Sequence, residues 1–119
     1  MFRRKPPPAP PPLAAVMGAG ARYSGDLTFE GRVRVDGHFT GRIYTEDLLE
    51  VGVEGVIEGE ADVARAVIAG RVQGRLRARE HLRLTRTGRI DGALDAGLIE
   101  VEPGGRIDAQ VKLRGEELP

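Results

Sequence analysis

The sequence predicts an all-β protein that folds as a single parallel β-helix, a triangular solenoid of about six turns. Three observations favour this fold. A motif of the form G-x-Φ-x-G-x-Φ, where Φ is apolar, recurs along the chain. Within the motif, apolar and polar positions alternate, which is the period of a strand rather than of a helix. Successive copies start 15 to 18 residues apart, so each copy corresponds to one turn of a solenoid.

Six copies of the motif follow one another, and the clearest is Gly-Arg-Ile-Asp-Gly-Ala-Leu at residues 88–94. The first copy has Ala21 in place of the first glycine, and the last has Ala109 in place of the second. The second glycine lies on the apolar side of the strand, where a side chain would crowd a narrow interior or a bend. The unequal spacing is expected to fall in turns, which tolerate it better than strands do. The copies start at Ala21, Gly37, Gly55, Gly70, Gly88 and Gly105.

The rest of each period supplies two more strands, so a turn of about 17 residues contains three. Each strand stacks on its equivalent in the next turn at about 4.8 Å, and six turns give a rod about 29 Å long. One set of strands precedes the glycine copies, at residues 33–35, 49–53, 67–68, 82–84 and 99–101. The other set is centred on small or β-branched residues, namely Thr45, Val63, Ala78 and Ala96.

Composition agrees with this class of fold. At 119 residues a single domain is expected, and the few aromatic residues suit an interior filled by stacked aliphatic side chains. The 18 basic residues equal the 18 acidic ones, so net charge gives no sign of a nucleic-acid partner. The absence of cysteine excludes disulfides and thiolate metal sites and suits a reducing cytoplasm. No run is apolar and long enough to span a membrane, and there is no signal-peptide core.

Residues 1–20 form a different region, a disordered basic and proline-rich tail that precedes the β-helix domain at residues 21–113. Residues 114–119 form a short disordered C-terminal tail. The prolines between Pro6 and Pro12 predict a stiff polyproline II spacer. An apolar and basic tip on such an arm can act as a tether to anionic lipid, and many tips on one polymer would bind by avidity. Two other interpretations stay open: an ordinary disordered start, and a ligand for a proline-binding domain. The candidate membrane-targeting residues are Met1, Phe2, Arg3, Arg4 and Lys5.

The outward side chains of the glycine strand are expected to stack in two columns. Stacked arginines repel one another, so the neighbouring acidic column is expected to compensate through pairs such as Arg89 with Asp91 and Arg106 with Asp108. These are solvated surface pairs worth less than about 1 kcal/mol each. One column is Arg22, His38, Val56, Arg71, Arg89 and Arg106, and the other is Ser24, Thr40, Glu58, Gln73, Asp91 and Asp108.

The sequence offers no catalytic, cofactor or metal site. His38 and His81 are isolated from any ligand-like spacing. Asp91, Asp95 and Asp108 invite comparison with the carboxylates of β-helical carbohydrate enzymes, but the tight turns here leave no room for a cleft. No glycine run forms a phosphate-binding loop. We therefore expect neither an enzyme nor a bound cofactor.

The two ends of the rod are the candidate functional surfaces. Each end exposes an unpaired strand edge over apolar interior side chains, and no amphipathic helix is available as a cap. End-to-end assembly is the physical expectation, through either like or unlike ends. The alternative is that residues 13–19 fold back as a cap. The candidate contact residues are Tyr23, Leu27 and Phe29 at the N-terminal end, and Ile99, Val101, Ile107, Val111 and Leu113 at the C-terminal end.

The segments VDGHFTGRI, GVIEGEA, AGRVQGRL and TGRIDGAL, together with the basic start and the proline-rich arm, resemble those of a bactofilin. The resemblance covers residues 18–113 and the first five residues. It implies a right-handed β-helix that polymerises end to end, without nucleotide, into non-polar filaments. It also implies a cytoplasmic bacterial protein beneath the inner membrane that scaffolds cell-wall or cell-shape machinery, with Met1 to Lys5 as the matching membrane-targeting positions. Members often carry an aromatic residue near the start of the last turn, where this chain has Pro103-Gly104-Gly105.

The functional hypothesis is therefore a cytoskeletal scaffold subunit peripheral to the inner face of the cell membrane. Its expected partners are further copies of itself, anionic inner-membrane lipid and cell-wall or cell-shape proteins, and nucleic acid is not among them. One alternative is a non-polymerising β-helical binding module for a cell-envelope protein. Another is an enzyme of the β-helical carbohydrate class, for which the cleft is missing.

Overall fold

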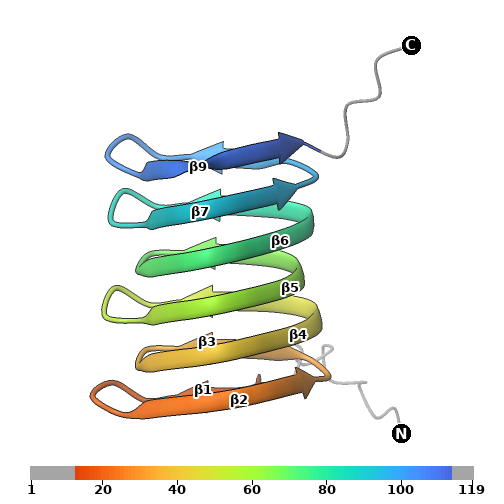
Figure 1. Cartoon of the computed structure of the whole chain (residues 1–119), viewed down its shortest axis with the longest axis vertical. Coiled ribbons are helices and arrows are strands. Elements are labelled where there is room, and N and C mark those ends of the chain that lie inside the picture. The colour runs from red at the N-terminus through yellow and green to blue at the C-terminus, as the bar shows by residue number, and fades with distance from the viewer. Residues whose placement is uncertain (1–12, 114–119) are drawn as a thin grey trace, which may run out of the picture.

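Nine β-strands coil into one rod in the computed structural model, which describes residues 13–113 (Figure 1). Every strand pairing in the described range is parallel, and that range contains no helix. The strands are β1 Leu13–Met17, β2 Arg22–Phe29, β3 Arg32–Val35, β4 His38–Val51, β5 Val56–Ile68, β6 Arg71–Leu84, β7 Arg89–Ala96, β8 Ile99–Val101 and β9 Arg106–Leu113. The predicted all-β parallel solenoid of about six turns is confirmed.

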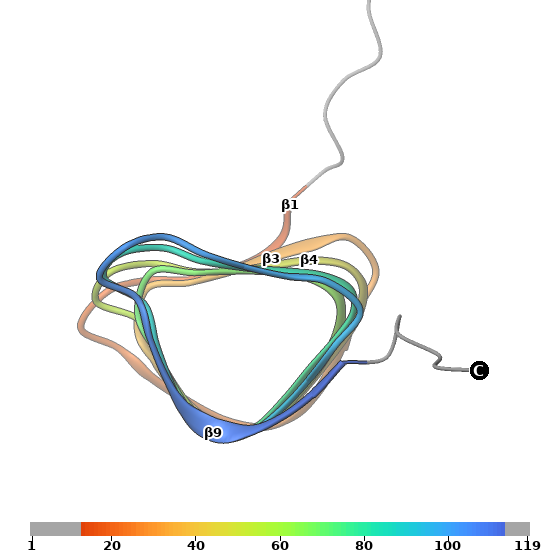
Figure 2. The ribbon, with the colours of Figure 1, turned by 90° about the horizontal axis from the view of Figure 1, so that it is seen from above.

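The cross-section of the rod is a triangle, as the view along its axis shows (Figure 2). In Figure 1 the front strands run from left to right and the chain returns behind them while it climbs toward the C-terminus, so the coil is right-handed. We call the three sides face A, face B and face C. Face A consists of β1, β3, residues 48–51, 65–68 and 81–84, and β8.

Faces B and C come from one continuous strand in every turn, where the sequence suggested two short ones. The strand bends at the second glycine of the motif and keeps its pairing across the bend. Face B is formed by residues 22–24, 38–40, 56–58, 71–73, 89–91 and 106–108, and face C by residues 26–29, 42–45, 60–63, 75–78, 93–96 and 110–113.

The bend explains the second glycine. Gly59 has a φ of 132°, in the left-handed region that only glycine adopts without strain. A Cβ added there would also strike the carbonyl oxygen of Gly41 in the preceding turn. The crowding is thus with backbone at a bend, not with the filling of the interior. No non-glycine residue in the described range has a positive φ, so Ala109 in the last turn takes another backbone conformation.

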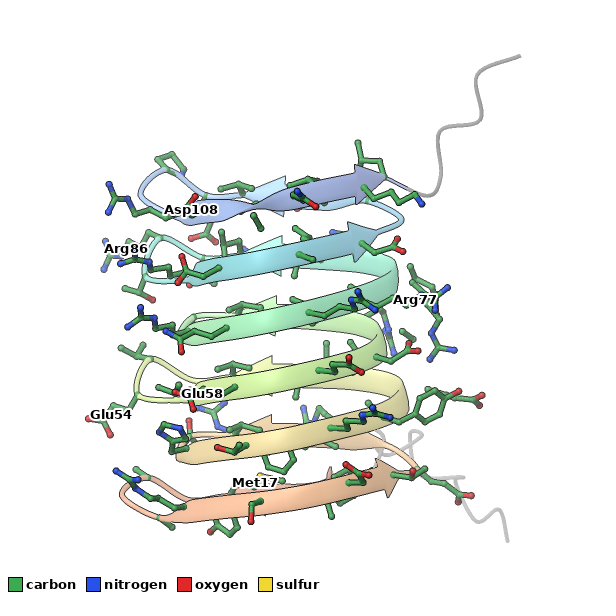
Figure 3. All side chains as sticks on the ribbon, in the orientation of Figure 1. Met17, Glu54, Glu58, Arg77, Arg86 and Asp108 are labelled. Atoms are coloured by element: carbon green, nitrogen blue, oxygen red, sulfur yellow. The ribbon has the colours of Figure 1, made fainter. Side chains whose placement is uncertain are left out.

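The unequal spacing of the repeats falls in the corners, as predicted. Between faces A and B the corner has two residues at 36–37 and 69–70. It has four residues in the other turns, at 18–21, 52–55, 85–88 and 102–105. The four-residue corners are the loops along the left side of Figure 1, and Glu54 and Arg86 lie on two of them in Figure 3. The strands keep their register because the corners absorb the differences.

The interior is a stack of apolar columns. Phe39 lies over Ile57 and Val72 on face B, and all three are fully buried. Thr45 is the buried polar side chain of the core. Its hydroxyl donates a hydrogen bond to the Gly31 carbonyl at 2.7 Å and accepts one from the Asp47 amide at 3.2 Å, so its burial leaves no polar atom unsatisfied. The positions that the sequence placed on the third strand, Thr45, Val63, Ala78 and Ala96, all point into this core.

The rod begins earlier than the predicted residue 21. Residues 13–17 form β1, which pairs with β3 so that Ala15 lies beside Val33 and Met17 beside Val35. Met17 is buried and Ala15 packs against the core, while Val16 faces solvent. The segment therefore adds a rung to face A, because its side chains alternate with a strand period. The segment does not fold back across the end of the rod as a cap, which was the alternative left open by the sequence.

Charged side chains link successive turns on the outer surface. Arg65 reaches Asp47 at 2.8 Å, and Arg83 reaches Glu102 at 2.9 Å. Arg34 contacts Asp36 at 2.8 Å, and this hydrogen bond, followed by the Coulomb attraction of the same carboxylate, raises the pKa of Arg34. These pairs are solvated and each contributes less than about 1 kcal/mol.

The predicted pair on face B, Arg89 with Asp91, is present at 3.3 Å. The same carboxylate also meets Arg71 from the turn below at 3.6 Å. Within residues 13–113 the side chains of Arg106 and Asp108 do not pair. One of the two expected pairs within a turn is therefore present, and Asp91 compensates arginines of two turns.

Arg79 connects three turns at the corner between faces C and A. Its guanidinium donates to the carbonyl oxygens of Thr45, at 3.0 Å, and Val63, at 3.4 Å. It also lies 5.3 Å from the centre of the Tyr44 ring and contacts Asp62 at 3.4 Å. This arginine satisfies corner carbonyls that lie outside the regular ladder.

Candidate polymerisation surfaces

The N-terminal end of the rod leaves interior columns uncovered on one side. Tyr23 is in register with Phe39, but it is 36% exposed whereas Phe39 is fully buried. Leu27 and Phe29 occupy the matching positions of face C, are half-buried and pack against the core. These residues are exposed because the column ends there, not because they point outward.

The structure adds Ala15 and Met17 to this end, which the sequence analysis treated as linker residues. The alternation of inward and outward positions in residues 13–17 was the available signal. It was short, and it lay beside the glycines at Gly18 and Gly20, which favour a loop.

The C-terminal end shows the same situation with aliphatic side chains. Val111 stacks on Leu94, and their exposed fractions are 48% and 1%. Leu113 lies over Ala96 and is likewise exposed. Ile107 and Ile99 are half-buried over Ile90 and Leu82, and Val101 is exposed over Leu84. The five predicted residues therefore gather on one end surface.

Each end also presents the free edge of a strand. Among the described strands, β2 pairs with β4 alone and β9 pairs with β7 alone, so one edge of each has no partner strand. Such an edge is a row of unpaired N–H and C=O groups. An apolar surface framed by these groups is complementary to another strand end, which makes it suited to assembly rather than to chemistry.

The side chains that could support catalysis are not brought together. His38 contacts Glu58 at 3.3 Å, and His81 contacts Glu100 at 3.0 Å, each across one turn. Asp95 lies on face C whereas Asp91 and Asp108 lie on face B, so these carboxylates form no cluster. In the part of the chain that the structure describes, no group of three acidic or histidine side chains is arranged to hold a metal ion.

The candidate membrane-targeting residues, Met1 to Lys5, lie outside the described residues. The described chain starts at Leu13 in β1, on the first rung of face A (Figure 1). Within residues 13–113 there is no helix long and apolar enough to cross a membrane.

Comparison with known proteins gives a consistent result. The family model described as "Bactofilin: Polymer-forming cytoskeletal" matches residues 15–112. Bactofilin BacP of Myxococcus xanthus is 32% identical over 97 residues, which cover 78% of this chain and 40% of BacP. Bactofilin BacO of the same organism is 27% identical over 103 residues, covering 83% of this chain and 82% of BacO. No solved structure matches the chain.

The family match spans nearly all of the coiled region, from residue 15 in β1 to residue 112 in β9. It agrees with the repeats, with the parallel solenoid and with two open ends that have the properties of a self-associating surface. The chain therefore belongs to the bactofilin family, the polymer-forming cytoskeletal proteins.

Proposed function

We propose that the protein is a filament subunit that polymerises end to end without nucleotide and serves as a cytoskeletal scaffold. The observation that carries this proposal is the open interior at both ends of the rod, where Tyr23 and Val111 continue buried columns and remain exposed. Strand edges and apolar side chains supply the contact themselves, so assembly requires no nucleotide.

The size of the C-terminal contact can be estimated from its side chains. Burying a valine or leucine side chain fully contributes about 1.5 to 3 kcal/mol. Val101, Val111 and Leu113 are each about half exposed, so covering them contributes about 2 to 4 kcal/mol before the cost of association. Edge hydrogen bonds add to this. Each contact is modest, and its repetition along a polymer provides the stability.

Contacts between like ends are supported by Ala21. In later turns this corner position is glycine. The case that matches Ala21 is Gly105, because both end a four-residue corner, and a Cβ at Gly105 would lie 2.8 Å from the Thr85 carbonyl oxygen of the turn below. Because Ala21 carries a Cβ, the C-terminal turn of another copy would have to shift in order to continue the coil below it. This crowding disfavours unlike ends and supports like ends, which give a non-polar filament.

Sedimentation of the full-length protein in buffer without nucleotide tests self-assembly. We expect species far larger than the 12.8 kDa chain. A single species with the mass of one chain would overturn the proposal. It would favour the alternative of a non-polymerising binding module for a cell-envelope protein.

We also propose that the filaments lie on the cytoplasmic face of the inner membrane and recruit cell-wall or cell-shape proteins, with Met1 to Lys5 as the lipid contact. Support comes from the residue types, since Phe2 is apolar and three basic side chains follow it. Each basic charge contributes about 1 kcal/mol near an anionic surface. The tails on one filament would act together.

Deleting residues 1–5 is expected to lower binding to anionic liposomes about 100-fold or more, because about 3 kcal/mol of electrostatic attraction is lost. Co-sedimentation with liposomes measures this, and zwitterionic liposomes are the control for charge. Filament formation should persist in the deletion variant, which separates the tether from assembly. Unchanged co-sedimentation with anionic liposomes would exclude this role for the tail.

A further inference from the structure

Face C carries two outward columns whose charges alternate from turn to turn. The pairing register places these side chains one above another along the rod. From the first turn to the sixth, column 1 contains Asp26, Arg42, Glu60, Arg75, Ala93 and Gln110. Column 2 contains Thr28, Tyr44, Asp62, Arg77, Asp95 and Lys112.

The pairs within these columns are loose and open to solvent. Arg42 and Glu60 are 3.5 Å apart, with side chains 69% and 49% exposed. Asp62 and Arg77 approach only to 3.9 Å, and Asp62 also contacts Arg79 at 3.4 Å. Figure 3 shows Arg77 projecting outward from the side of the rod. Such side chains can take a second partner at little cost, because each is more than a third exposed and none is held in a tight bidentate geometry.

We propose that face C pairs with face C of a second copy, with the two rods side by side and antiparallel. The two-fold axis runs along the strands, between the third and fourth turns. Rotation by 180° about this axis generates the second copy. Each column then faces the same column of the second copy, and the third turn of one copy faces the fourth turn of the other. Glu60 then faces Arg75 of the second copy, and Asp62 faces Arg77 of the second copy. The two-fold axis doubles both pairs, as in any isologous interface.

The remaining positions of face C are compatible with this arrangement. Tyr44 faces Asp95 of the second copy, while its hydroxyl donates a hydrogen bond to Glu46 of its own chain at 3.2 Å. Thr28 faces Lys112 and Asp26 faces Gln110, both of the second copy. Arg42 faces Ala93 of the second copy. No like charges oppose each other at any position, because each column alternates in sign across the central turns.

Other lateral arrangements bring like charges together. If the two rods were parallel, column 1 would face column 2, so that Glu60 would oppose Asp62 and Arg75 would oppose Arg77. On face B, an antiparallel pair would place Arg22 opposite Arg106, and on face A it would place Arg34 opposite Arg83, given the same registers. Like charges that face one another are unfavourable. Charge therefore selects face C and the antiparallel direction.

The area of the face determines when this pairing occurs. Four residues of extended strand span about 13 Å and six rungs about 29 Å, which gives about 380 Å² per copy. A stable pair needs about 800 Å² per partner, so two isolated rods would associate weakly. In a filament the contact repeats along its length and becomes effective. The inference thus rests on the proposed polymerisation.

A charge exchange tests the pairing. Variant 1 carries Arg75→Glu and Arg77→Glu, and variant 2 carries Glu60→Arg and Asp62→Arg. Preformed filaments of either variant alone should stay single, because like charges then meet at the two-fold axis. Mixing the two kinds of filament should restore pairs. The control Arg71→Glu with Arg89→Glu, on face B, should leave pairing unchanged. The measurement is the distribution of filament widths by negative-stain electron microscopy.

Salt provides an independent readout. Raising ionic strength from about 50 mM to about 500 mM should separate paired wild-type filaments into single ones, since the Debye length falls from about 14 Å to about 4 Å and the pairs are open to solvent. Single wild-type filaments at low salt, or variants that still pair when alone, would overturn this inference but not polymerisation. A wild-type protein that forms no filaments would overturn the proposed function, and this inference with it.

Discussion

Replacing Val111 by arginine is expected to reduce long filaments to short units of one or two subunits. Val111 is half exposed on the C-terminal end, over Leu94. A guanidinium there would be buried without a partner when two ends meet, and such burial costs several kcal/mol. This exceeds the apolar contribution of the whole C-terminal contact. Contacts at the N-terminal end are untouched, so pairs of rods should persist. Filament length by negative-stain electron microscopy measures the effect.

Val53→Arg is the matched control for this variant. Val53 is 69% exposed, more than Val111, but it lies in the corner at residues 52–55, far from both ends. The same substitution there should leave filament length unchanged. Because Val111 is already exposed in the single rod, the thermal unfolding of the rod itself should change little. Long filaments of the Val111→Arg variant would show that this end is not a contact.

Gly59→Ala is expected to destabilise the rod by about 3 to 5 kcal/mol. Two effects add. A φ of 132° costs a non-glycine residue about 1 to 3 kcal/mol. In addition, the new Cβ strikes the Gly41 carbonyl, which cannot move without breaking the ladder between β4 and β5. Denaturant unfolding measures the loss in the Val111→Arg background, which removes long filaments, and at one fixed protein concentration, so that the remaining N-terminal pairing contributes equally to the proteins compared.

Gly25→Ala separates the two effects. Gly25 has the same conformation, with a φ of 131°, but a Cβ there meets nothing within 4 Å because no turn lies below it. This variant should lose only the conformational term, about 1 to 3 kcal/mol. Equal losses at Gly25 and Gly59 would contradict the collision between turns.

The sequence was sufficient to predict the solenoid because each repeat shows the alternation of apolar and polar residues that is typical of a strand. Phe39, Ile57 and Val72 occupy the same place in three copies, and the structure stacks them. The end residues could be predicted from the same periodicity. The last member of each interior column, such as Val111, has no further turn to cover it. The fold and the position of the candidate contact surfaces could therefore be derived without coordinates.

Features that depend on one turn meeting another could not be derived in this way. Ala15 and Met17 alone make a short inward pattern, and the strand at residues 13–17 exists because β3 supplies the pairing partner. Arg79 reaches Thr45 across two turns, through a contact that no local pattern encodes. Asp91 contacts Arg71 as well as Arg89. Side-chain rotamers, which the repeat pattern does not specify, determine which surface charges pair.

Electron cryo-microscopy of the unmodified protein in buffer without nucleotide tests the central claim most directly. Stacked rods predict filaments whose strands run across the axis, with a spacing of about 4.8 Å along it. Like-end contacts predict an axial repeat of two subunits, about 58 Å for twelve rungs. A repeat of one subunit, about 29 Å, would contradict the like-end contact that Ala21 supports. A field of separate rods would contradict end-to-end polymerisation itself.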